Sequence, residues 1–523
     1  MGSLETIFVL LFAAVLLVGI AQKIRVPYPI ALVLGGIVIS FVPGLNVPSF
    51  DPNIILFIVL PPVLYYASFG IAFRKFQQNW KEIFSLALGL VAVTTLVIGV
   101  IFKWMFPEFS WALAFAFGAL ISPPDAIATT SILKRFSINS QLLTLLEGES
   151  LINDASALVL YKLAVVALFS GTFSWMEGSM EFVQAVVGGV AVGFILGFAM
   201  QFFSKKYLEP AVGILFSFSI PYITYIIASY LEVSGVLAVV VNGLIGSRII
   251  LTHHSSLRRV LGYGIWDIFI ILLNCFVFIM IGLQLRTVIS VHTTNQMVLY
   301  AGYAVLIFLA LIVVRMIWVY TRSGIAYYRA LKNPKSSTEC PQILRTAAII
   351  GWSGMRGIVS LAAAISLPFY MLDGSYLEGR NEVIFISFIV ILLSLVIPGL
   401  TLPALIRWLK IQQHSTQVDE NKIRNELART AEKKLHELFN KQVINDREHE
   451  FLKSYFIAQH RLLEMSHKKG KLPNIETARL HVIQAQRQRL LDMWNVEEID
   501  DKLLMHLEGE LDIAEVHIAR VEL

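Results

Sequence analysis

Residues 139–170 read NSQLLTLLEGESLINDASALVLYKLAVVALFS, an apolar run long enough to cross a bilayer that carries Glu149 and Asp154 near its centre. An ionised group at that depth costs about 3 kcal/mol or more, and proteins keep one there mostly to move ions or protons. Two other apolar runs carry comparable interruptions, SPPD at 122–125 and GMRG at 354–357. Together these three polar clusters predict a membrane protein that transports ions.

The composition also indicates a membrane protein. The chain has 523 residues, of which 56% are hydrophobic and 15% charged, whereas a soluble domain carries about 25% charged residues. Its mean hydropathy is +0.69. We expect an all-α, polytopic fold with broken helices. The two cysteines, Cys275 in an apolar run and Cys340 in a loop, do not suggest a disulfide framework.

The apolar runs divide the chain into candidate spans. A hydrocarbon core of about 30 Å needs about 20 apolar residues per helix, and the sequence offers thirteen such candidates. Their approximate limits are 4–21, 28–43, 53–71, 82–105, 110–133, 139–170, 179–203, 209–231, 235–250, 261–289, 296–320, 342–370 and 381–408. The ninth is short enough to be a re-entrant segment instead. The first has no basic segment before it, so we interpret it as a span and not as a cleavable signal peptide.

Charges in the connections support this count and predict the orientation. Connections that follow odd-numbered spans carry seventeen Lys and Arg residues, against three in those that follow even-numbered spans. Basic residues favour the cytoplasmic side, so we expect the N-terminus outside and the C-terminus in the cytoplasm. Because no organelle signal is evident and the tail is compact, we expect an integral, multi-pass protein of a bacterial inner (plasma) membrane.

Hydropathy falls after the last span. We therefore expect a transmembrane domain at 1–410 and a cytoplasmic region at 411–523. Apolar residues such as Leu435, Leu438 and Phe439 recur at helical spacing in the polar tail. The pattern predicts a helical regulatory tail, whose ligand or partner the sequence does not indicate.

Spacing within the sixth span places its polar side chains on two strips. Ser150 and Asp154 are four residues apart, as are Glu149 and Asn153, so each pair shares one helix face. A carboxylate beside a hydroxyl suits a hard monovalent cation, which prefers oxygen ligands. The alternative is a buried aspartate that is held by hydrogen bonds between helices and binds no ion.

The fifth span should break at Pro123 and Pro124, because two prolines remove two backbone donors and clash with the preceding turn. A break leaves free carbonyl groups and half-helix ends, with which transporters coordinate ions at mid-membrane. Asp125 lies at the break, and Thr129 and Thr130 follow one turn later. The alternative is a simple proline kink packed on its neighbours.

The twelfth span carries a buried charge among glycines. Gly354 and Gly357 permit local unwinding or close approach, and Arg356 between them needs a carboxylate or carbonyl partners. We expect Arg356 to pair with Glu149, which would leave Asp154 as the titrating group. Arg356 then has a structural role without direct ion contact.

Other polar and small residues in the spans are weaker candidates. Asp267 and Asn274 on the tenth span, and Arg315 on the eleventh, either line the site or pair internally. A small-residue stripe on the seventh span predicts tight packing inside one protomer or, alternatively, a dimer seam. The stripe consists of Gly189, Gly193 and Gly197.

The polar motifs GESLIND at 148–154, SPPD at 122–125 and GMRG at 354–357 resemble those of the NhaP/NHE branch of the monovalent cation/proton antiporter family. The resemblance covers about residues 5–410. It implies thirteen spans in an inverted repeat and a homodimer within the lipid bilayer. It also implies a core domain, holding spans 5, 6 and 12, that moves against a dimerisation domain.

The resemblance also implies roles for individual residues. By motif match, Asp154 carries the cation and the proton in turn. Asp125 and Ser150 assist Asp154 in binding Na⁺, and Asn153 shapes the site. The buried ion pair described above is implied as well.

Two positions depart from the family pattern. Many relatives carry a Glu where this chain has Tyr66 on the third span. Some relatives have Thr where this chain has Pro124, whose backbone carbonyl remains available to bind an ion. Both departures leave the preferred cation open.

The function that we expect is exchange of Na⁺, or of K⁺ or Li⁺, for H⁺ by alternating access, serving pH regulation and sodium homeostasis. Burial disfavours the charged form of a carboxyl group, so cation and proton compete for it. Because Asn153 cannot ionise, each loaded state carries about the same charge, which predicts electroneutral exchange. The alternatives are a K⁺/H⁺ antiporter on the same scaffold, a cation channel, or a receptor whose tail signals. We expect no enzymatic activity, no cofactor and no nucleic-acid partner.

Overall fold

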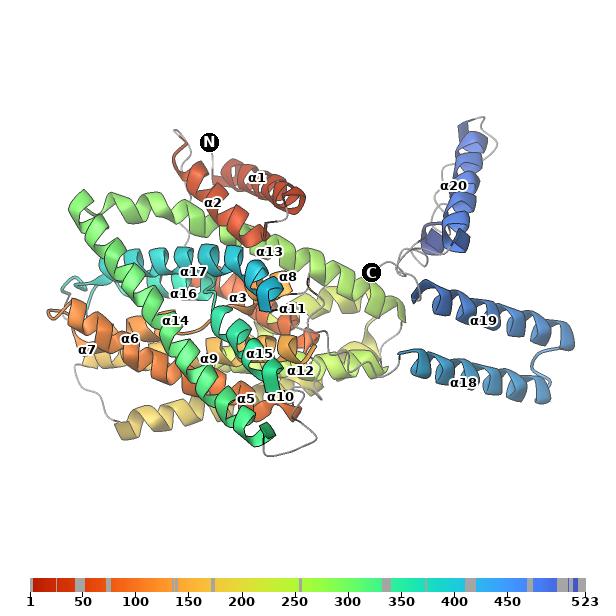
Figure 1. The fold of residues 1–523 in the computed structure, drawn as a ribbon, viewed down its shortest axis with the longest axis horizontal. Coiled ribbons are helices and arrows are strands. Elements are labelled where there is room, and N and C mark those ends of the chain that lie inside the picture. The colour runs from red at the N-terminus through yellow and green to blue at the C-terminus, as the bar shows by residue number, and fades with distance from the viewer. Residues whose placement is uncertain are drawn as a thin grey trace. The chain divides into compact units, whose positions relative to one another are not determined.

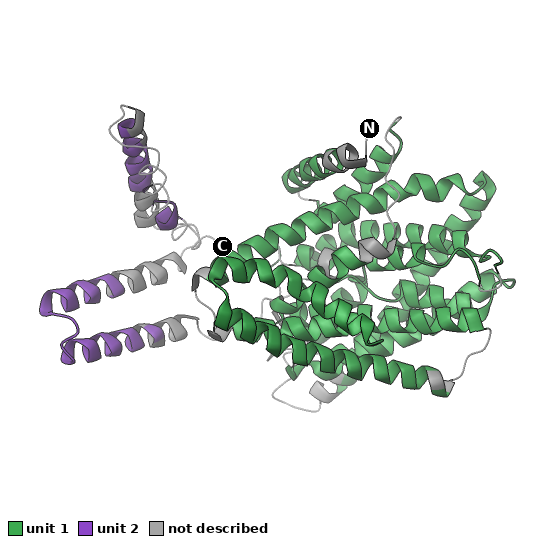
Figure 2. Ribbon diagram, turned by 180° about the vertical axis from the view of Figure 1, so that it is seen from behind, with its two compact units in different colours: residues 1–413 green, residues 414–523 purple. Residues whose placement is uncertain are grey.

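The structure is a computed structural model, and it divides into two compact units, residues 1–413 and residues 414–523 (Figure 2). The predicted domain boundary, after residue 410, falls in a stretch outside the described residues. The structure describes residues 3–24, 26–42, 52–71, 77–133, 136, 140–170, 175–253, 256–331, 340–371, 374–409, 420–467, 474–495, 507 and 511–515.

The first unit is a bundle of helices (Figure 1). Its elements are α1 (Ser3–Lys23), α2 (Tyr28–Ser40), α3 (Pro52–Gly70), α5 (Trp80–Phe84), the π-helix η1 (Ser85–Leu90), α6 (Val91–Met105), α7 (Trp111–Ile121), α8 (Ala126–Leu133), α9 (Ser140–Ser170), α10 (Trp175–Tyr207), α11 (Pro210–Tyr230), α12 (Gly235–His253), α13 (Ser256–Ser290), α14 (Thr294–Leu331), α15 (Cys340–Trp352), α16 (Ile358–Ile365) and α17 (Arg380–Leu409). In the described part of the chain, the pairing outside helices is one isolated bridge between Tyr370 and Tyr376.

Each predicted span corresponds to one of these helices or to a run of them. Within the described residues, seven helices are long and apolar enough to cross a membrane. The others are shorter apolar helices or half-helices, and the ninth predicted span forms one unbroken helix, α12. The all-α, polytopic membrane fold is therefore confirmed.

Two spans are broken, the fifth where the sequence predicted a break and the twelfth where its glycines permitted local unwinding or close approach. The fifth splits into α7 and α8 across the paired prolines, and the twelfth splits into α15 and α16 across the glycine-rich segment. The two breaks lie against each other: the amide of Asp125 donates to the carbonyl of Met355 at 2.6 Å, and the Thr129 hydroxyl donates to the carbonyl of Ser353 at 2.8 Å. Backbone groups freed at one break are thus satisfied at the other.

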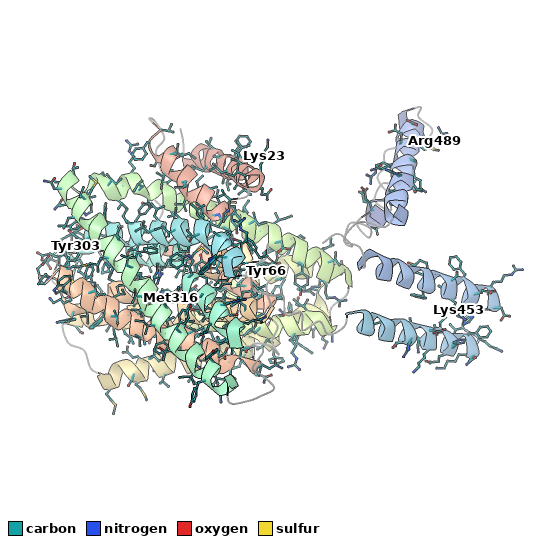
Figure 3. All side chains as sticks on the ribbon, viewed as in Figure 1. Lys23, Tyr66, Tyr303, Met316, Lys453 and Arg489 are labelled. Carbon is teal, nitrogen blue, oxygen red and sulfur yellow. The ribbon has the colours of Figure 1, made fainter. Side chains whose placement is uncertain are left out.

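Helix packing separates the first unit into two halves. In the scaffold half, which we define as α1–α3 and α10–α13, α2 lies along α13, while α3, α10 and α11 pack on α12 (Figure 1). In the broken-helix half, defined as α5–α9 and α14–α17, α7 packs on α6 and α9, and α14 packs on α15 and α17. Side chains fill these interfaces; Met316 of α14, for example, occupies the space above Gly351 of α15 (Figure 3).

The small-residue stripe on α10 packs inside the protomer. A Cβ atom added at Gly193 would collide with the backbone of Ala238 on α12, and one at Gly189 would lie 2.6 Å from the carbonyl oxygen of Ser234. Small residues permit this close helix approach in a membrane. The stripe therefore joins α10 to α12, as the first of its two predicted roles required.

One backbone carbonyl of the π-helix η1 accepts a hydrogen bond from a side chain on α9. The Ser156 hydroxyl on α9 lies 2.7 Å from the carbonyl oxygen of Ala87 in η1 and 2.9 Å from that of Asn153. A π-helix disturbs the regular hydrogen-bond ladder and is often found near functional sites. Ser156 thus ties η1 to the helix that carries the GESLIND motif.

The second unit contains α18 (Glu420–Asn440), α19 (Asp446–His467) and α20 (Asn474–Asn495). Helices α18 and α19 pack against each other as a hairpin. Asn445 and Glu448 form a reciprocal capping box at the start of α19, with both bonds at 2.9 Å. Leu435 is buried, as its place on the apolar face of the predicted amphipathic helix requires.

Candidate functional site

Asp125 lies where the breaks of the two interrupted spans meet. Asp125 follows the two prolines directly, and its amide is fixed on the carbonyl of Met355. Its carboxyl group lies against Gly357, where an added Cβ atom would collide with it. The glycine that opens α16 therefore makes room for the carboxyl group at the start of α8.

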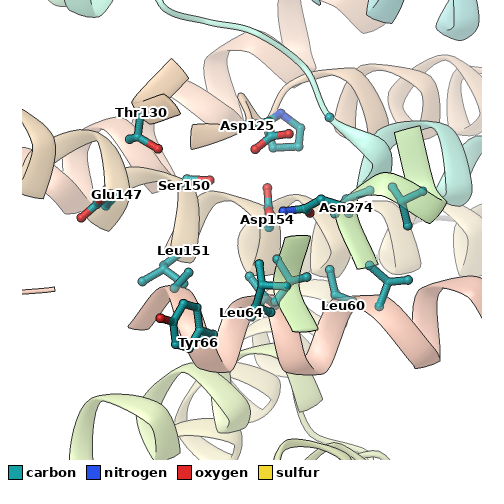
Figure 4. Close-up of a pocket in the computed structure, with 18 of the residues that line it drawn as sticks. Leu60, Leu64, Tyr66, Asp125, Thr130, Glu147, Ser150, Leu151, Asp154 and Asn274 are labelled. Carbon is teal, nitrogen blue, oxygen red and sulfur yellow. The ribbon is translucent and has the colours of Figure 1, made fainter. Parts of the chain in front are cut away.

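Helix α9 places the GESLIND motif against the same break. The side-chain amide of Asn153 donates to the carbonyl of Pro124 at 3.2 Å, and the Ser150 hydroxyl lies 3.5 Å from the same oxygen. Asn153 is fully buried, and its Oδ1 atom has no hydrogen-bond partner in the described part of the chain. Asp154, one residue on, is half-buried, and Figure 4 shows its carboxyl group directed toward that of Asp125 across an open space.

That space is a cavity of about 330 Å³ between the two halves. Helices α3 and α13 form its scaffold wall, and α8, α9, α16 and both breaks form the opposite wall. Asp125, Asp154 and Asn274 lie at its deep end (Figure 4). From there it extends past Glu147 and Tyr66 toward the end of the bundle where α3 ends and α9 and α13 begin.

The other side of Asp154 is nearly closed. The void there has a volume of about 10 Å³ and is lined by Ala157, Leu158 and Tyr161 further along α9. Among the residues that the structure describes, Asp154 therefore has room on one side only. That side is the one whose connections carry most of the basic residues, which we expect to be cytoplasmic.

Glu149 forms a buried ion pair, but not with the predicted partner. Arg315 of α14 donates to both carboxylate oxygens of Glu149, at 2.5 and 2.9 Å, and its Nε atom donates to the carbonyl of Ile350 at 2.9 Å. The predicted pair of Glu149 with Arg356 is therefore wrong. The planar guanidinium of Arg315 matches the carboxylate bidentately.

The guanidinium group of Arg356 donates its hydrogen bonds to backbone carbonyl groups instead. Its Nε atom donates to the carbonyl of Ile121 at 3.0 Å, and its Nη1 atom to that of Gly354 at 2.7 Å. Ile121 is the last residue of α7, and Ile350, bound by Arg315, lies in the last turn of α15. Each arginine thus places positive charge at the C-terminal end of a half-helix, where the helix dipole favours it.

A family model described as "Sodium/hydrogen exchanger, transmembrane" matches residues 8–408. The chain belongs to the sodium/hydrogen exchanger family. The predicted resemblance is thereby confirmed, and the family is one of transporters.

Curated relatives agree with the assignment of this chain to the exchanger family. The chain is 31% identical over 414 residues to the uncharacterised Na⁺/H⁺ exchanger YjcE of Escherichia coli, covering 76% of this chain and 75% of the relative. It is 30% identical over 502 residues to the sodium, potassium, lithium and rubidium/H⁺ antiporter of Bacillus pumilus, covering 91% of this chain and 72% of the relative.

A solved structure shows the same fold. The sodium proton antiporter MjNhaP1 from Methanocaldococcus jannaschii aligns with a TM-score of 0.61 at 19% identity, covering 78% of this chain and 98% of that one. This likeness supports the helical architecture of the exchanger.

The structure resolves the two open alternatives for the weaker site candidates. Asp267 and Asn274 both line the cavity, whereas Arg315 pairs internally with Glu149. Asn274 also donates weakly to the Tyr28 hydroxyl, at 3.4 Å. Glu147, which also lies on the cavity wall, was not among the predicted site residues. It precedes Asp154 by seven residues, or two helical turns, and that spacing places both on one face of α9.

Proposed function

We propose that this exchanger carries a monovalent cation, Na⁺ in the first instance, in exchange for protons, and that both compete for Asp154. The observation that carries the proposal is that the carboxyl groups of Asp154 and Asp125 face each other at the deep end of the cavity. The two buried arginines nearby are engaged elsewhere, Arg315 by Glu149 and Arg356 by backbone carbonyls. A cation or a proton is therefore left to neutralise the carboxyl group of Asp154.

The surrounding oxygen atoms suit such a cation. Beside Asp154 at the break lie Asp125, Ser150 and the Pro124 carbonyl. The Oδ1 atom of Asn153, which has no hydrogen-bond partner among the described residues, lies there as well. Carboxylate, hydroxyl and freed carbonyl oxygens are the groups that broken helices offer to cations in transporters. We assign Asp154, Asp125 and Ser150 as the Na⁺ ligands, with Asn153 and Pro124 shaping the site.

Charge balance favours one-for-one exchange. Glu149 is neutralised by Arg315, and Asn153 cannot ionise, so Asp154 exchanges one positive charge for another. Loaded states then carry the same charge whether the passenger is a cation or a proton. We infer that the exchange is electroneutral and that the broken-helix half shifts against the scaffold half to move Asp154 between the two sides.

We place the exchanger in a bacterial inner membrane with the N-terminus outside, and we assign residues 1–410 to transport and residues 411–523 to cytoplasmic regulation. The distribution of basic residues in the connections supports this orientation. The family resemblance supports a homodimer, in which the scaffold half supplies the contact. Sodium homeostasis and pH regulation follow from such an exchange.

The test is a cation-induced change of an imposed pH gradient in proteoliposomes, with Na⁺, K⁺ and Li⁺ added in turn. Asp154→Asn should abolish the response to every cation, while Glu209→Gln, at an exposed residue before α11, should retain it. Retained exchange in Asp154→Asn would exclude Asp154 as the carrier.

Two alternatives remain distinct outcomes of this assay. A response to K⁺ equal to or greater than that to Na⁺ would indicate a K⁺/H⁺ antiporter; the name of the Bacillus pumilus relative includes both ions. Cation currents that follow the electrochemical gradient without proton movement would indicate a channel.

A further inference from the structure

The scaffold wall of the cavity carries a carboxylate of its own. Asp267 of α13 lines the cavity and accepts a hydrogen bond of 2.5 Å from the phenol of Tyr66 on α3. The ring of Tyr66 stacks on that of Trp266, with centroids 5.6 Å apart and planes 3° apart. Asp267 itself is exposed.

A chain of contacts through three helices holds this carboxylate in place. Trp266 is buried, and its indole nitrogen donates to the Ser217 hydroxyl on α11 at 2.9 Å. That hydroxyl in turn donates to the carbonyl of Ile214 at 2.6 Å. Ordering an exposed side chain costs conformational entropy. A supporting network of this kind therefore fixes where the negative charge of Asp267 lies.

Asp267 lies between the open end of the cavity and Asp154. Asp267 precedes Asn274 on α13 by seven residues, and Glu147 precedes Asp154 on α9 by seven residues, about 10 Å along each helix. Both helices begin at the same end of the cavity, and Figure 4 shows Tyr66 and Glu147 on opposite walls at that end. A cation that moves from this end to Asp154 passes Asp267 first.

We propose that Asp267 captures the transported monovalent cation on the scaffold wall before it reaches Asp154, and that Tyr66 is the positioning residue for Asp267. The proposal rests on the proposed function. A fixed negative charge in a low-dielectric cleft raises the local cation concentration. Asp267 therefore sets the apparent affinity for the cation from this side, while Asp154 sets whether exchange occurs at all.

The experiment measures the KM and maximal rate for Na⁺ at one fixed pH in everted membrane vesicles, whose outer face is the expected cytoplasmic side. Asp267→Asn should raise the KM about tenfold with a maximal rate within about twofold of the parent. Tyr66→Phe keeps the ring on Trp266 but removes the donor, and it should raise the KM about threefold. Asp267→Glu, which restores the charge, should return the KM to within about twofold of the parent.

Ionic strength separates charge from shape. Raising it with choline chloride from about 10 mM to about 300 mM shortens the screening length and should reduce the effect of Asp267→Asn on the KM to about twofold or less. A purely structural role would lower the maximal rate instead and would not depend on salt. Glu209→Gln, which removes an exposed acid away from the cavity, is the matched control and should leave the KM unchanged.

An unchanged KM in Asp267→Asn, or a KM in Asp267→Glu as high as in Asp267→Asn, overturns the proposal. If Asp267→Asn does not fold, an unchanged KM in Tyr66→Phe also overturns it. Failure here is distinguishable from failure of the proposed function, because the latter shows as exchange retained in Asp154→Asn whatever the state of Asp267.

Discussion

The ion pair between Glu149 and Arg315 allows a quantitative test of the buried charge network. Both side chains are almost completely buried, with 2% and 4% exposure, and the pair is bidentate. Removing one partner of such a pair costs about 3–5 kcal/mol, because the other charge stays buried without compensation. We therefore expect Glu149→Gln and Arg315→Gln each to lower the free energy of unfolding by about that amount.

A double-mutant cycle isolates the interaction itself. Hydrogen bonds to charged groups contribute about 1.5–3 kcal/mol each, so the coupling between Glu149→Gln and Arg315→Gln should be about 3 kcal/mol. The corresponding cycle with Arg356→Gln should give about 1 kcal/mol or less, because Arg356 donates to the carbonyls of Ile121 and Gly354 instead.

The measurement is the free energy of unfolding of each variant in mixed micelles, titrated with a denaturing detergent. The two cycles share the parent protein and Glu149→Gln. They also need the single variants Arg315→Gln and Arg356→Gln and the two double variants that combine each of these with Glu149→Gln. A coupling energy with Arg356 equal to or larger than that with Arg315 would refute the assignment of the pair.

Two further variants probe the site and its support. Gly357→Ala places a Cβ atom against the Asp125 carboxyl group and should reduce the exchange rate at least tenfold, which raises the activation free energy by about 1.4 kcal/mol. The control Gly302→Ala, whose added Cβ atom would have nothing within 4 Å, should exchange like the parent protein in the same vesicle assay. Equal rates in the two variants would contradict the close contact at Gly357. Ser156→Ala leaves the Ala87 carbonyl of η1 without its side-chain donor and should lower the free energy of unfolding by about 1–3 kcal/mol. The control Ser179→Ala, at an exposed residue, should lower it by almost nothing. Similar losses in both variants would contradict the role assigned to Ser156.

The helices could be predicted because the membrane imposes a simple rule on sequence. Each span must be an apolar run of sufficient length, and basic residues mark one side. The breaks were predictable as well, since Pro123 and Pro124 cannot continue a helix and Gly354 and Gly357 weaken one. The π-helix at Ser85–Leu90 left no comparable signal, because the donor to its Ala87 carbonyl, Ser156, lies on another helix.

The partner of Glu149 could not be predicted for a related reason. Arg315 and Arg356 both lie within apolar runs, and sequence position gives depth but not which helix faces which. The choice depends on α14 packing across α15, and on the break that offers carbonyls to Arg356. The role of Asp267 was equally hard to predict, because the residues around it in the sequence do not indicate that it contacts Tyr66, which is 201 positions away in the chain.

The hydrogen bond from Thr129 to Ser353 joins residues that are 224 positions apart. A ribosome adds about 5–20 residues per second, so roughly 11–45 s separate the synthesis of these two residues. Throughout that interval the fifth span lies in the bilayer without the hydrogen bond that joins its proline break to the twelfth span. The two breaks can therefore join only after residue 353 has been synthesised, so the site is completed late in membrane insertion and not as each span enters the bilayer.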